Sequence, residues 1–74
     1  MKKFYGVMTD IYDDDTWAVF PLYGQHERKP PDTLEQYPGV RTYKDWFETE
    51  KMAKLFMKLK TENLKKIFME MEAV

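Results

Sequence analysis

The C-terminal third of the chain contains neither glycine nor proline, and this uninterrupted stretch constrains the fold most. Apolar residues recur there with helical period, and Thr49 just before Glu50 is a typical helix N-cap. Asp45 with Glu48 offers a competing capping-box start. We prefer Thr49, because residues 43–47 read as a strand. A helix of about 24 residues would be about 36 Å long.

The predicted helix is amphipathic, with a broad apolar stripe and an opposite side rich in lysine. The stripe consists of Met52, Ala53, Leu55, Phe56, Met57, Leu59, Leu64, Ile67, Phe68 and Met71. Lys60, Asn63 and Glu70 intrude on it, so the second half is less cleanly amphipathic. The sequence leaves open whether the helix continues through residues 60–63.

The N-terminal segment, residues 3–23, predicts a β-hairpin around a polar turn at residues 13–16. Two- and four-residue loops both pair Ile11 with Ala18, Thr9 with Phe20 and Val7 with Leu22. This register collects six apolar side chains on one face: Tyr5, Val7, Ile11, Ala18, Phe20 and Leu22. Pro21 lacks an N–H donor, so its position must be at a free edge or a bulge.

Residues 24–39 hold three of the four prolines and predict a connection, with one helical turn possible over 32–37 before Pro38-Gly39. Residues 40–47 predict a third strand. The expected fold is a single α+β domain, residues 1–74, in which a hairpin and a third strand form a small antiparallel sheet packed on the C-terminal helix (ββ-loop-βα). We expect Val7, Phe20, Trp46, Leu55, Phe56 and Leu59 to share its core. A helix this long should overhang so small a sheet.

The chemistry available to the chain is narrow. Cysteine and serine are absent, and His26 is the single histidine, so Ser-His and Cys-His nucleophile pairs cannot form within one chain. The Asp13-Asp14-Asp15 run lacks the spacing of a calcium loop and reads as a turn, while His26 reads as a solvated loop residue. We therefore expect no enzyme activity, no cofactor and no metal site.

The charges nearly cancel, with 12 basic against 13 acidic residues, which is atypical of a general nucleic-acid binder. No apolar run is long enough to span a membrane, and no signal peptide begins the chain, so a cytoplasmic location is expected.

Contact surfaces are the remaining functional candidates. If the sheet ends before the helix does, the C-terminal apolar residues stay uncovered and should bind a partner protein or form a homodimer. The predicted partner-binding residues are Leu64, Ile67, Phe68 and Met71. The alternative is nucleic-acid binding through Lys54, Lys58 and Lys65, with exposed aromatic residues such as Tyr37 or Trp17.

Five short motifs carry a resemblance to a group of known sequences: Phe4-Tyr5-Gly6-Val7, Ile11-Tyr12-Asp13-Asp14, Lys29-Pro30, Asp32-Thr33 and Tyr43-Lys44-Asp45-Trp46-Phe47. They are similar to short, uncharacterised proteins of gut Firmicutes and their phages and mobile elements. The resemblance spans residues 3–57, and the long Lys- and Met-rich helix departs from it. It implies an accessory protein that binds and disables a host protein, for which a defence or nuclease complex is the expected target class.

Overall fold

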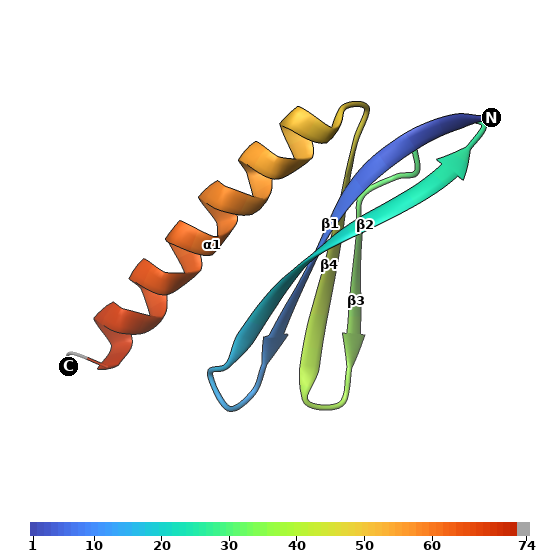
Figure 1. The fold of residues 1–74 in the computed structure, drawn as a ribbon. Helices are drawn as coiled ribbons and strands as arrows, with labels where there is room; N and C mark the ends of the chain where they lie inside the picture. The colour runs from blue at the N-terminus through green and yellow to red at the C-terminus, as the bar shows by residue number, and fades with distance from the viewer. Residues whose placement is uncertain (73–74) are drawn as a thin grey trace.

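The fold has two layers, a four-stranded sheet and one helix (Figure 1). The computed structural model describes the backbone of residues 1–72 and the side chains of residues 1–69. Its elements, in chain order, are β1 (Lys2–Tyr12), β2 (Trp17–His26), β3 (Thr33–Tyr37), β4 (Val40–Phe47) and α1 (Glu50–Glu72). The strands are antiparallel in the order β2-β1-β4-β3. The predicted α+β class and the C-terminal helix are confirmed.

The first hairpin forms where predicted, but its register differs by one residue. Ile11 pairs with Trp17 rather than Ala18, and Val7 pairs with Pro21. The cause is a three-residue loop. Asp15 N–H donates to the Tyr12 carbonyl at 3.1 Å, and Asp15 then adopts a left-handed backbone (φ 67°), which is the usual type I turn with a bulge.

The predicted connection at residues 24–39 is mostly sheet, so that part of the prediction is wrong. β2 continues to His26, and residues 33–37 form β3 rather than a helical turn. Pro38-Gly39 closes the β3–β4 hairpin, since proline followed by a glycine at φ 83° matches a type II turn. Only the segment from Glu27 to Asp32 remains irregular, and it passes from one edge of the sheet to the other (Figure 1).

The helix begins as predicted, because the Thr49 hydroxyl accepts a hydrogen bond from Met52 N–H at 3.2 Å. It runs unbroken through residues 60–63. The predicted overhang is wrong. β1 and β2 have 11 and 10 residues, and at about 3.4 Å per residue they are as long as a 23-residue helix of about 35 Å.

The helix covers the face of the sheet that carries the odd-numbered side chains of β1, β2 and β4. Met57 lines a hollow with Pro21 of β2, and Phe56 meets Phe47 of β4 at 5.1 Å between ring centroids. Val7 is buried between these layers, together with Ala53 and Leu64 of α1.

The predicted core is therefore only partly correct. Val7 lies in it and Phe56 flanks it, but Leu55 and Leu59 are exposed on α1. Phe20 and Trp46 lie on the opposite face of the sheet. The one-residue change of register turns every β2 side chain, Phe20 included, to the other side. Trp46 lies there because β4 pairs it with Gly6, on the even-numbered face of β1.

Candidate protein interface

The molecule is flat for its size. Its principal extents are 48 × 27 × 13 Å and its radius of gyration is 13.7 Å, against about 11 Å for a compact 74-residue domain. Among the described side chains, only Phe4, Val7, Ala53 and Leu64 are buried hydrophobic residues. A chain with 43% apolar residues therefore leaves much apolar surface accessible, and a large part of this surface lies in two areas.

The first area is the helix strip, which we define as Met52, Leu55, Leu59 and Ile67. Met52, Leu55 and Leu59 are spaced i, i+3, i+7 and so line one side of α1, where they are 54%, 57% and 55% exposed. Ile67 continues the strip two turns further on, beyond Asn63. The strip lies on the flank of α1 toward β4, next to Phe56 and above Lys60, whose ammonium lies 5.4 Å from the Tyr43 ring centroid.

The predicted partner-binding residues do not share one surface. Leu64 is only 4% exposed and packs between the helix and the sheet, whereas Ile67 is exposed. Phe68 is half-buried on the opposite flank, where it lines a surface hollow with Trp17. The side chain of Met71 lies outside the described residues. The exposed apolar surface of α1 therefore lies mainly in its N-terminal half.

The second area is the helix-free face of the sheet, formed by the even-numbered side chains of β1, β2 and β4 and the odd-numbered ones of β3. Two glycines shape one end of it. A Cβ on Gly6 would lie 3.0 Å from Trp46 Cε3, and one on Gly24 would lie 2.6 Å from His26 Nε2. The Trp46 and His26 rings therefore lie against backbone that carries no side chain. They contact each other edge to face, with 5.4 Å between the ring centroids.

His26 is consequently a packed aromatic residue at the end of β2 and not the solvated loop residue that the sequence predicted. Phe4 lies beneath it, at 6.3 Å between ring centroids, and is buried. The Glu27–Asp32 connection reaches this end of the face, where Asp32 Oδ1 accepts the Trp46 N–H at 2.8 Å. Arg28 and Lys29 border a hollow above Phe4.

The rest of the helix-free face is open and largely apolar. Phe20 is 43% exposed, and Met8, Ala18 and Leu22 beside it are half-buried. In the next row Asp10 accepts a hydrogen bond from the Thr42 hydroxyl at 2.7 Å, so its carboxylate is satisfied within the face. The sequence missed this surface because the predicted register placed Phe20 in the core.

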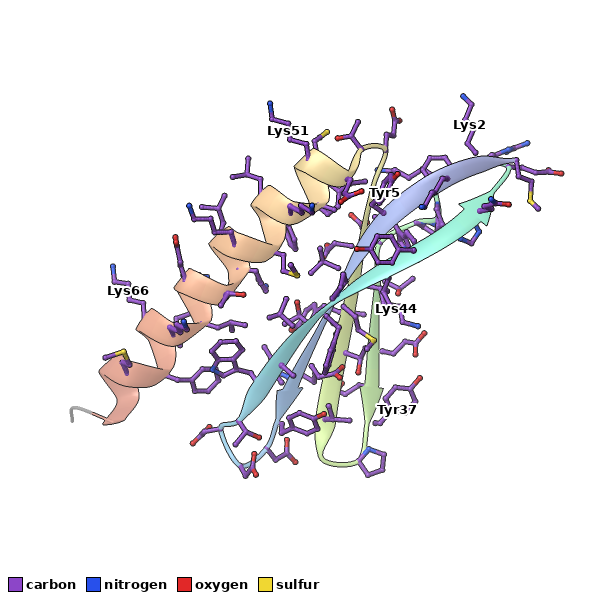
Figure 2. The ribbon with its side chains drawn as sticks, in the orientation of Figure 1. Lys2, Tyr5, Tyr37, Lys44, Lys51 and Lys66 are labelled. Atoms are coloured by element: carbon purple, nitrogen blue, oxygen red, sulfur yellow. The ribbon has the colours of Figure 1, made fainter. Side chains whose placement is uncertain are left out.

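The residues of the nucleic-acid alternative lie on different sides of the molecule. Lys54, Lys58 and Lys65 are exposed on α1, and the Lys54 ammonium is 2.7 Å from a Glu50 carboxylate oxygen. Lys51 and Lys66 also point from the helix away from the sheet, whereas Tyr37 and Lys44 lie on the far side of the sheet (Figure 2). Trp17 is half-buried beside Phe68.

Local contacts explain the shifted pKa values of two carboxylates, Asp14 and Asp45. Hydrogen bonds from the Thr16 hydroxyl and N–H lower the pKa of Asp14, which fits its predicted place in the turn. Partial burial and the Asp32 carboxylate raise the pKa of Asp45, and Lys60 opposes this shift. Among the side chains of residues 1–69, the structure contains no group of three or more potential metal ligands.

The hollow between α1 and strands β1 and β2 measures about 70 Å³. The hollows above Phe4 and beside Trp17 measure about 310 and 360 Å³, at the lower end of the 300–1,000 Å³ typical of a small-molecule site. No helix in the described part of the chain has the length and apolar character to cross a membrane. Comparison with protein-family models, with curated proteins and with solved structures finds no match for this chain.

Proposed function

We propose that the chain is a non-enzymatic protein-binding module that acts by contact, as an inhibitor or adaptor directed at a host protein. The observation that carries this proposal is the helix strip, where three large aliphatic side chains in succession on one side of α1 are each more than half exposed. Aliphatic side chains facing water along a helix flank are a frequent mark of an interaction site.

The surroundings of the helix strip support contact with a protein rather than with a nucleic acid. Methionine and leucine side chains adapt to a partner's apolar surface, and the strip continues onto Phe47 and Tyr43 of β4 through Phe56 and Lys60. Lys51 and Lys58 border it on the outer side of α1. A complementary partner would present an apolar ridge with acidic residues beside it.

The resemblance to mobile-element proteins supplies the expected target class, a host defence or nuclease complex. Nucleic-acid binding is the weaker proposal, because the lysines of α1 and the exposed Tyr37 face opposite directions (Figure 2) and cannot hold one strand together.

The proposal is tested by affinity capture from host lysate with three forms of the tagged protein. The wild-type chain should retain a specific host protein, and a Leu55→Asp/Leu59→Asp variant should lose it at least tenfold, since hot-spot contacts are each worth about 2 kcal/mol or more. The matched control is Lys54→Ala/Lys65→Ala, which alters the same helix and spares the strip and the lysines that border it.

Both variants change exposed side chains and should keep the wild-type circular dichroism spectrum. Undiminished capture by the folded Leu55→Asp/Leu59→Asp variant would refute the proposed site. Loss of capture only in the lysine variant, with nuclease-sensitive binding, would favour the nucleic-acid alternative.

A further inference from the structure

The helix-free face has the composition of a surface that is covered in solution. Phe20 and Met8 are cross-strand partners at its centre, Leu22 and Ala18 flank them, and the layer above them is missing. The Glu27–Asp32 connection approaches only the end near Phe4. A sheet with one solvated face normally alternates apolar with polar side chains, and the central rows of β1 and β2 here do not.

We propose that this face is covered by the same face of a second copy, giving a two-fold symmetric dimer with two sheets inside and two helices outside. The inference goes beyond the proposed function, because it uses the surface that the helix strip leaves free. In such a dimer the sheets would pack about 10 Å apart, with their strands inclined by about 30°.

Charge favours a second copy as the occupant. A surface that meets itself must be close to neutral, and the helix-free face carries Asp10 and Glu35 against Lys2 and Lys44. The helix is less suited to self-association, because its sequence carries lysines at 51, 54, 58, 60, 65 and 66 against glutamates at 50, 62, 70 and 72.

Size also fits a dimer. Four strands at about 4.8 Å spacing, over the seven residues from Gly6 to Tyr12 at about 3.4 Å each, give a face of roughly 19 by 24 Å, or about 460 Å² in projection. The accessible surface is larger, because side chains stand above the sheet. It approaches the roughly 600–800 Å² per partner of a small stable interface, so we expect a dissociation constant in the micromolar range.

The sheet edges are poor alternatives for self-association. Tyr12 N–H donates to the Thr16 carbonyl at 2.9 Å, and antiparallel pairs alternate between bonded and non-bonded. Pro21 and Val7 therefore form a non-bonded pair. The Pro21 nitrogen, which has no hydrogen to donate, faces outward in the middle of the β2 edge. The other edge, β3, has only five residues. Pairing of edge strands would be interrupted or short.

The test is sedimentation equilibrium of the full chain from about 1 to 200 µM. The wild type should shift with concentration from 9.0 kDa toward twice that mass. Phe20→Asp should raise the dissociation constant by about 30-fold or more, since it puts a charge at the centre of the interface. The matched control is Leu34→Asp, which alters a strand residue of 57% exposure on the other face and should leave the constant within about threefold.

Ala18→Lys serves as a second variant in case Phe20→Asp fails to fold. It removes no packed atoms, and it should also weaken the dimer. A wild type that stays at 9.0 kDa throughout overturns the proposal. So does a dimer that survives both face variants, or one that is lost in Leu34→Asp. Loss of the dimer in Leu55→Asp/Leu59→Asp would instead place the dimer interface on the helix. The two face variants, Phe20→Asp and Ala18→Lys, should leave capture of the host protein unaffected.

Discussion

Replacing Leu64 with alanine should remove a large share of the stability of this fold. Leu64 is 4% exposed between α1 and the sheet, and truncation of a buried leucine costs about 2–5 kcal/mol, depending on how far the cavity collapses. In a two-layer fold only 13 Å thick, partial collapse is expected, so we predict about 3 kcal/mol. The total for 74 residues is about 4–11 kcal/mol.

Leu55→Ala is the matched control, because it makes the same change on the same helix at a side chain that is 57% exposed. Its free energy of unfolding should change by less than about 0.5 kcal/mol, since alanine's higher helix propensity offsets the small loss of contact. Urea titrations measure both differences, and the melting temperature of Leu64→Ala should fall by roughly 10–25 °C. Equal losses in the two variants, or a greater loss at Leu55, would refute the orientation of the helix.

Three further changes test other features of the fold. Thr9→Val should raise the free energy of unfolding by about 1 kcal/mol in urea titrations, because the fully buried Thr9 hydroxyl lacks a hydrogen-bond partner. Asp15→Gly should raise it by about 0.5–1 kcal/mol by relieving the left-handed backbone of the turn. Because burial and Asp32 raise the pKa of Asp45, ionisation of Asp45 lowers stability as the pH rises through that pKa. Asp45→Asn should therefore melt at a higher temperature than the wild type at pH 7, and the difference should shrink toward pH 4.

Features that depend on a few neighbouring residues were predicted correctly from the sequence. The helix start at Thr49, the strand at residues 40–47 and the turn at Asp13–Asp15 all depend on side-chain chemistry within a few residues, and the structure confirms them. Pro21 on an edge strand is likewise confirmed. Such features need no knowledge of distant contacts.

Some features follow from the geometry of a single turn, which sets the facing of every residue in the strand after it. These features could not be predicted. A loop of three residues rather than two or four exchanged the faces of β2, and Phe20 moved from the expected core to the helix-free face. The sequence could have suggested the three-residue loop, because aspartate at its third position tolerates a left-handed backbone.

The exposed apolar side chains of α1 differ from those that the sequence predicted for a related reason. The overhang that singled out Leu64 to Met71 assumed short strands, whereas β1 and β2 reach as far as the helix and bury Leu64. The angular position of Leu55 and Leu59 on the edge of the apolar stripe was the available signal that the sheet would leave them exposed.

The methionines provide the most direct test of the claim that the chain works by contact through the helix strip. Met52 lies in the strip and is 54% exposed, while Met69 is also exposed but lies on the other flank of α1. Oxidation footprinting of the chain alone and in complex with its captured partner, read residue by residue by mass spectrometry, compares the two. We predict that the partner lowers the oxidation rate of Met52 at least fivefold and leaves that of Met69 within twofold. Equal oxidation of Met52 in the free and bound chain would contradict the proposed function.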